Sequence, residues 1–204
     1  WRDVVLLRAF AKFLRQAQIP FSQAYMEETL ARNPDLTRLL VRQFKLRLDP
    51  DFDGDRDQLE GVLGAAVEQA FESVANLDED RILRRYANLI NATLRTNFFC
   101  ASATGEPEMT VAFKFDSRSL DELPLPKPLR EIWVYCPRFE AVHLRFGMVA
   151  RGGLRWSDRR EDFRTEILGL VKAQQVKNAV IVPVGSKGGF VLKKAPQDRD
   201  GFQE

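Results

Sequence analysis

A lysine set among glycines is the feature of this sequence best suited to chemistry. Lys187 stands in the segment PVGSKGG, with Gly185, Gly188 and Gly189 around it. An apolar run at residues 179–184 precedes it, and the ends of buried strands commonly present catalytic groups. An exposed lysine in a glycine-rich turn is the alternative. Three glycines around one lysine favour a site, because they leave room for a substrate to lie directly against the amine.

A predicted helix over residues 159–177 places two more polar groups on its apolar side. The apolar residues recur at helical spacing: Phe163, Ile167 and Leu170. The same steps of four and three residues lead to Gln174 and Lys177. A buried ammonium is costly unless an anion meets it. Lys177 can equally reach solvent near the helix C-terminus, where the helix dipole favours a cation. The spacing alone leaves both interpretations open.

The segment RGGLRWSD, upstream of this helix, combines glycines with cations. Gly152 and Gly153 let the backbone approach a ligand closely, and Arg151 and Arg155 stand beside them. Residues 151–194 contain ten Lys or Arg and four Asp or Glu, an excess of +6 in a chain whose net charge is +2. Such a bias favours an anionic partner, although a solvated basic surface has the same composition.

Other motifs point to less chemistry. His143 is the single histidine, so the chain contains neither a Ser-His-Asp triad nor a histidine metal cluster, and we expect no metal site. The acidic loop at residues 49–60 matches the spacing of a calcium-binding EF-hand loop. Pro50, Arg56 and the lack of a second such loop argue against calcium. We therefore predict an acidic turn whose Asp side chains cap the next helix.

Helices are predicted over the first hundred residues and strands after them. Apolar stripes at helical spacing indicate five helices, and the fifth runs through Leu94. We predict Ser22, Asn33 and Asp78 as helix N-caps, with Pro34 at the first helical position after Asn33. Strands are predicted at 109–115, 131–135, 142–149, 179–184 and 190–192. The predicted class is α+β or α/β. The predicted divisions are a helical region at 1–100, a strand and Pro-rich connector at 101–130, and a truncated catalytic part at 131–204.

Composition narrows the class of protein. With 204 residues, 45% hydrophobic and 29% charged, the chain is neither disordered nor a fibrous repeat. No apolar run approaches the roughly 20 residues of a membrane-spanning helix, and no secretory leader opens the chain. Cys100 and Cys136 suit neither a disulfide framework nor a metal site, so we expect two buried, inert thiols in a cytoplasmic protein. A start at Trp1 and an end on GFQE indicate a piece of a longer polypeptide.

Two stretches together resemble a known enzyme family. RGGLRWSD followed by KNAVIVPVGSKGG is similar to the substrate-domain core of glutamate dehydrogenases. LDEDRILRRYANLINATLRTNFF and REDFRTEILGLVKAQQVKNAVIVPVGSKGGF resemble the large bacterial NAD-specific class, and the likeness covers essentially the whole chain. The resemblance implies an all-helical N-terminal region followed by the first part of a mixed α/β substrate domain.

The resemblance also implies roles for particular residues. Lys187 matches the catalytic lysine that polarises the substrate carbonyl. Gln174 and Lys177 match the pair that holds the substrate α-carboxylate. Gly152 and Gly153 match the glycines that line the pocket. Arg151 falls where smaller family members use a lysine for the side-chain carboxylate, and an arginine there permits a bidentate grip.

The function implied is that of a segment of an NAD-dependent glutamate dehydrogenase. The family's general-base aspartate and its NAD domain are missing from this chain, so we expect the isolated chain to be inactive and NAD to bind elsewhere. The full-length enzyme is expected to be a homo-oligomer acting on L-glutamate and 2-oxoglutarate, without nucleic-acid or membrane partners. The alternatives are a dehydrogenase of another amino acid and a noncatalytic helical interaction module.

Overall fold

The computed structural model describes residues 1–101, 105, 108–177 and 184–194, and of residues 174–177 it describes the backbone. Five helices come first: α1 (Arg2–Gln16), α2 (Gln23–Arg32), α3 (Pro34–Leu48), α4 (Arg56–Phe71) and α5 (Leu77–Ala92). The strands are β1 (Thr93–Thr96), β2 (Val111–Phe115), β3 (Arg130–Tyr135), β4 (Phe139–Arg145), β5 (Leu154–Trp156) and β6 (Ser186–Leu192), with α6 (Phe163–Lys177) between the last two. The predicted order, helices first and a mixed α/β part second, is confirmed.

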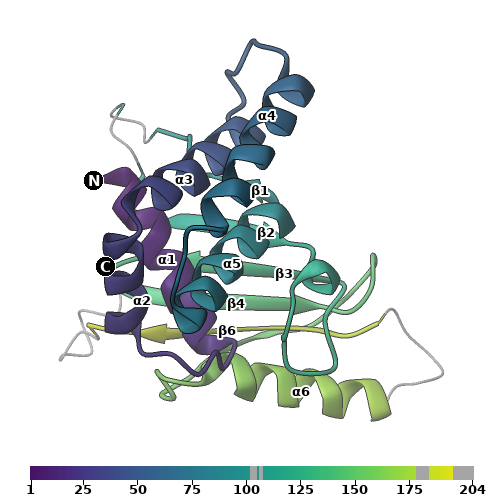
Figure 1. Cartoon of the computed structure of the whole chain (residues 1–204). Coiled ribbons are helices and arrows are strands. Elements are labelled where there is room, and N and C mark those ends of the chain that lie inside the picture. The colour runs from purple at the N-terminus through teal and green to yellow at the C-terminus, as the bar shows by residue number, and fades with distance from the viewer. Residues whose placement is uncertain (102–104, 106–107, 178–183, 195–204) are drawn as a thin grey trace.

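The strands of the described residues form one mixed sheet with the order β1-β2-β3-β4-β6-β5. Neighbouring strands are antiparallel except β5 and β6, which are parallel. Helices lie across one face of this sheet (Figure 1). The parallel pair at one edge joins the segment of Arg151, Gly152 and Gly153 to the segment of Lys187.

Trp133 of β3 marks the face of the sheet that the helices cover. Its fully buried ring lies 5.8 Å from Phe13 of α1 and 6.0 Å from Phe163 of α6. Its indole N–H donates a 3.0 Å hydrogen bond to Ala9 O, so the buried polar atom is satisfied. Both α1 and α6 therefore pack on the same face, and one hydrophobic core serves the helical and the sheet parts.

Helix starts were predicted with mixed success. Ser22 caps α2, because its hydroxyl accepts from Tyr25 N, as predicted. The start of α3 at Pro34 is also confirmed, but the Asn33 side chain does not cap it. The prediction of Asp78 as the cap of α5 is wrong, because Asn76 Oδ1 accepts from both Asp78 N and Glu79 N.

The strand predictions differ from the structure in several places, among them the unpredicted strand β5 and the end of β4 at Arg145, before the predicted residue 149. Thr93 and Leu94 belong to β1 and not to the preceding helix. The strand β4 begins at Phe139, earlier than predicted, because Cys136 N bonds to Phe139 O and closes a tight turn after β3. The segment around Lys187 is the start of β6 and not a turn. Residues 178–183 lie outside the described residues, so the structure does not test the strand predicted at 179–184. The division of the chain at about residues 100 and 130 stays a prediction.

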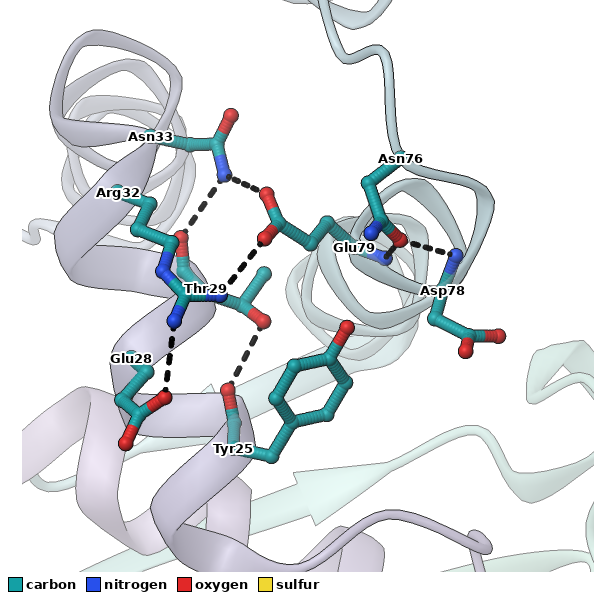
Figure 2. Close-up of polar contacts among 8 residues, drawn as sticks. All are labelled: Tyr25, Glu28, Thr29, Arg32, Asn33, Asn76, Asp78 and Glu79. Carbon is teal, nitrogen blue, oxygen red and sulfur yellow. Dashed lines mark hydrogen bonds and ion pairs between the residues drawn. The ribbon is translucent and has the colours of Figure 1, made fainter.

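A polar clamp of Arg32, Asn33 and Glu79 joins the end of α2 to the start of α5 (Figure 2). Asn33 Nδ2 donates 2.9 Å hydrogen bonds to Thr29 O and to Glu79 Oε2. Arg32 bonds at 3.2 Å to Glu79 Oε1 and at 3.2 Å to Glu28 Oε2. The two hydrogen bonds donated by Asn33 Nδ2 direct this side chain towards Thr29 and α5, and the side chain makes no cap hydrogen bond to α3. In the described residues no helix is long and apolar enough to cross a membrane.

Replacing Glu79 with glutamine tests this clamp. The hydrogen bond from Asn33, helped by the charge of Arg32, lowers the pKa of the Glu79 carboxyl below its ordinary 4.5. A carboxylate with a lowered folded pKa stabilises the protein above its unfolded pKa, and this stabilisation is lost as pH falls through the folded value. We expect Glu79→Gln to lower the free energy of unfolding in urea at pH 7, and the loss to shrink as pH falls below about 4.5.

The matched control is Glu28→Gln, since this carboxylate is 59% exposed and contacts the same arginine. The control should change the unfolding free energy little at any pH. A loss in Glu79→Gln that is equal at pH 7 and at pH 3 contradicts the proposed charge effect.

Candidate functional site

Lys187 lies in β6, partly buried, on the helix-covered face of the sheet. Its Cα pairs with Leu144 of β4, a fully buried residue. Residues opposite each other in a ladder point to the same face, and residues two apart along a strand do so too. Gly189, two residues further on, faces α6, because a Cβ on it would lie 2.4 Å from Ile167 Cδ1. The Lys187 side chain therefore leaves the sheet on the α6 side.

The two glycines after Lys187 leave space for side chains of neighbouring elements. At Gly189 the missing side chain lets α6 pack closely on β6. At Gly188 a Cβ would lie 2.3 Å from Leu154 Cδ2 and 3.1 Å from a ring carbon of His143, on the opposite face. The sequence-based idea that these two glycines clear space for a substrate is therefore replaced by a packing role.

Gly152 lets the segment before β5 come close to β6. A Cβ at this position would lie 1.4 Å from Ser186 O, a distance that no side chain can occupy. The close approach is held by backbone hydrogen bonds of 3.0 Å from Ser186 N to Arg151 O and from Gly188 N to Gly153 O. The glycine is required here for steric reasons.

Gly153 is the neighbour of Lys187 across the parallel pair. Leu154 pairs with Gly188, so the same register places Gly153 beside Lys187. A Cβ built on Gly153 meets no described heavy atom within 4 Å, in contrast to its neighbour Gly152. The surface next to Lys187 is thus open on this side, with room for part of a ligand.

Some cations near the site form ion pairs with carboxylates, and others do not. Several cations of the basic segment have carboxylate partners, in the pairs Arg155–Glu166, Arg159–Asp162, Arg164–Glu131 and Lys193–Glu140. Arg151 is exposed, and neither it nor Lys187 has a hydrogen bond or ion pair with a described side chain. Two cations flanking an open glycine provide a place for an anion.

The structure brings together only some of the predicted site residues. Arg151, Gly152, Gly153 and Lys187 meet at the β5–β6 edge. Gln174 and Lys177 belong to the last turns of α6, but their side chains lie outside the described residues. Their predicted contact with the substrate α-carboxylate stays a prediction.

Sequence reasoning missed the most buried polar contact near the site. Arg164 of α6 and Glu131 of β3 are both fully buried and form a bidentate pair with bonds of 2.6 and 2.8 Å. A charged residue is not expected on the apolar face of a helix, and its partner lies in a separate strand. The one available signal was that Glu131 shares the buried face of β3 with Trp133 and Tyr135.

The remaining candidates of the sequence do not join this site. His143 pairs with Gly188 and so points away from Lys187, and burial, with the nearby charge of Arg145, lowers its pKa. Asp55 caps α4 by accepting from Gln58 N, which confirms the acidic turn as a helix cap. Cys136 is buried as predicted, but the prediction is wrong for Cys100, which is exposed.

Alanine substitutions at the two adjacent glycines should separate these roles. Gly152→Ala forces β5 away from β6, and overpacking of this kind costs about 1–3 kcal/mol or more. Gly153→Ala meets open space, so its unfolding free energy should stay within about 0.5 kcal/mol of wild type. Urea unfolding followed by tryptophan fluorescence measures both, and equal losses would contradict the assigned close approach.

The sequence of the chain is similar to proteins of one enzyme family. Residues 66–204 match the family described as bacterial NAD-glutamate dehydrogenase, catalytic domain, and residues 1–50 match glutamate dehydrogenase, helical motif 3. The NAD-specific glutamate dehydrogenase of Mycobacterium tuberculosis is 55% identical over 96% of the chain, and that of Pseudomonas aeruginosa is 53% identical over 96%. A fungal relative of the same name from Neurospora crassa is 30% identical over 88% of the chain and is covered over 18% of its own length.

The matched region is a small part of these relatives. The chain spans 12% of the length of the two bacterial proteins. The family model nevertheless covers well over half of the chain, including the whole sheet and α6. The chain belongs to the bacterial NAD-glutamate dehydrogenase family.

Proposed function

We propose that the whole protein oxidatively deaminates L-glutamate and that this chain supplies the substrate side of its active site. The reaction converts L-glutamate, NAD⁺ and water into 2-oxoglutarate, ammonium, NADH and a proton. The observation that carries the proposal is Lys187, a partly buried cation without a described carboxylate partner, placed beside the open surface of Gly153. The names of the relatives support the same activity.

Lys187 acts on the oxygen of the substrate carbonyl in this proposal. Addition of water to the imine gives a carbinolamine, and loss of ammonia from it gives the carbonyl of 2-oxoglutarate. A fixed ammonium group donates a hydrogen bond to that oxygen and stabilises the negative charge that develops on it. A preorganised charge of this kind needs little rearrangement during the reaction, which makes it effective in catalysis.

The two ends of the substrate are assigned to different elements. Arg151, at the β5–β6 edge, binds the side-chain carboxylate, with Gly152 and Gly153 forming the adjacent wall. Gln174 and Lys177 of α6 bind the α-carboxylate. A cation at each end of the site matches a substrate with two carboxylates, and guanidinium and ammonium groups both suit carboxylate binding.

The cofactor is proposed to bind outside this chain. The sequence contains no G-x-G-x-x-G fingerprint, so its residues do not fit a dinucleotide site. The general base is also assigned to a part of the whole protein outside this chain, and the isolated chain is therefore expected to be inactive. A cytoplasmic location and a homo-oligomeric enzyme belong to the same proposal.

Replacing Lys187 with methionine in the whole protein tests the catalytic assignment. Loss of one preorganised charge or donor at a developing oxyanion costs about 10²–10³-fold in kcat. We expect a loss of this size in glutamate-dependent NADH formation, with the exposed Lys194→Met variant as the matched control at the other end of β6. An unchanged kcat in Lys187→Met would favour a noncatalytic module with a remnant of a site.

Substitutions of Arg151 test the substrate. A hydrogen bond to a charged group contributes about 1.5–3 kcal/mol, so Arg151→Ala should raise the KM for glutamate roughly 10–100-fold. The KM for norvaline, which lacks the second carboxylate, should change little, and Arg151→Lys should retain part of the glutamate affinity. Equal losses for both amino acids would remove Arg151 from the site and favour a dehydrogenase of another amino acid.

A further inference from the structure

The carboxylate of Glu166 on α6 ties β5 to the helix. Its Oε1 forms a 2.7 Å ion pair with Arg155 Nε, and its Oε2 accepts a 2.5 Å hydrogen bond from Ser157 Oγ. Arg155 is the central residue of β5, and Ser157 follows the last residue of that strand. One carboxylate of α6 thus contacts two residues at the edge of the sheet.

The side chains of Glu166 and Ser157 are largely buried, and neighbouring hydrogen bonds fix the orientation of Ser157. The Glu166 side chain is only 14% exposed, and Ser157 is 3% exposed. The Ser157 hydroxyl accepts from Arg159 N at 3.1 Å, so its single hydrogen is directed to Glu166. Ser157 N donates to Phe190 O of β6 at 2.9 Å, which fixes the backbone on the other side.

Apart from this tie, β5 is held by its pairing with β6, which includes the stacking of Trp156 on Phe190. β5 is a three-residue edge strand, all of its residues are exposed, and β6 is its one neighbour in the described sheet. Edge strands with few ladder hydrogen bonds belong to the less stable parts of a fold. The hydrogen bond from the buried Ser157 to the Glu166 carboxylate and the ion pair with Arg155, which is 59% exposed, together restrain the position of β5.

The tie connects the two elements that are proposed to hold opposite ends of the substrate. Arg151 and Gly153 lie directly before β5, whereas Gln174 and Lys177 lie on α6, the helix that carries Glu166. We infer that Glu166 is a positioning residue that fixes the spacing between these two carboxylate sites and thereby selects a five-carbon over a four-carbon dicarboxylate. The inference rests on the proposed function and adds the determinant of substrate length.

The physical reason is the rigidity of the spacing. Two charged sites at a fixed separation bind a dicarboxylate well only when its carboxylates have the same separation. If β5 could shift relative to α6, the two carboxylate sites would lose their fixed separation, and the site could adapt to a substrate that is one methylene shorter. The loss of Glu166 charge also makes the site more positive, but this change attracts both dicarboxylates alike. The ratio of the two affinities therefore isolates the geometric effect.

The experiment compares Glu166→Gln with wild type in the whole protein. Glutarate and succinate serve as competitive inhibitors of glutamate oxidation, and kcat/KM is measured for glutamate and aspartate. Glutamine keeps an oxygen acceptor for Ser157 but loses the ion pair with Arg155. We expect the preference for the five-carbon compounds to fall roughly tenfold, a fraction of the ~100-fold that a misplacement of 1 Å can cost.

Asp162→Asn is the matched control, because the Asp162–Arg159 pair lies within the turn before α6 and does not bridge to β5. Its five-carbon preference should equal that of wild type. Ser157→Ala removes the other half of the tie and should reduce the preference in the same direction. It replaces Glu166→Gln as the deciding variant if the latter does not fold, as judged by circular dichroism.

The outcomes separate this inference from the proposed function. An unchanged preference in a variant that folds, or equal losses for both chain lengths, overturns the positioning role and leaves the glutamate dehydrogenase assignment intact. A wild-type protein that neither oxidises glutamate nor binds glutarate overturns both. A reduced preference in Glu166→Gln and Ser157→Ala, with an unchanged one in Asp162→Asn, supports the inference.

Discussion

The position of α6 depends on the buried ion pair between Arg164 and Glu131. Neither side chain is exposed to solvent, and the guanidinium meets the carboxylate through two hydrogen bonds. Removing one partner of such a pair leaves an uncompensated buried charge, which typically costs about 3–5 kcal/mol. Gln16 of α1 adds to the anchor, because its Oε1 accepts from Arg164 N and its Nε2 donates to Arg160 O. The start of α6 is thus fixed to both the sheet and the helical region.

The glycines of the sheet edge work together with this anchor. Because α6 is fixed at Arg164, Ile167 one turn later comes to lie against Gly189, where any side chain would collide. Gly152 permits a similar close approach between β5 and β6. Lys187 is therefore held between two strands and under a helix whose positions are determined by contacts that tolerate little change. The catalytic assignment of Lys187 requires a rigid support of this kind.

The sequence predicted what local interactions determine. The helices, the Ser22 cap and the alternation in β2 and β3 follow from residues within a few positions of each other. The short edge strands β1 and β5 were missed, because four and three residues are too few to show alternation. Lys187 was expected between two predicted strands and not within one, since the pairing of β6 with β4 involves residues more than forty positions apart. The Arg164–Glu131 pair and the Glu166 tie were missed for the same reason: the partners are not neighbours in the sequence.

The pairing of charges also explains why the basic segment differs from an ordinary solvated surface. An excess of cations spread over a surface would be neutralised by solvent and salt, with no position favoured. Here the acidic groups near the site are used on cations that support the fold: Glu131 on Arg164, Glu166 on Arg155 and Glu140 on Lys193. Each of these pairs neutralises a cation that would otherwise compete with Arg151 and Lys187 for a bound anion. Arg151 and Lys187 are among the cations of this segment that have no carboxylate partner in the described part of the chain, and they lie beside Gly153, whose missing side chain is replaced by no described atom. The proposed dicarboxylate would meet two cations that have no ion pair with any described side chain, so its binding there would break no ion pair among the described residues.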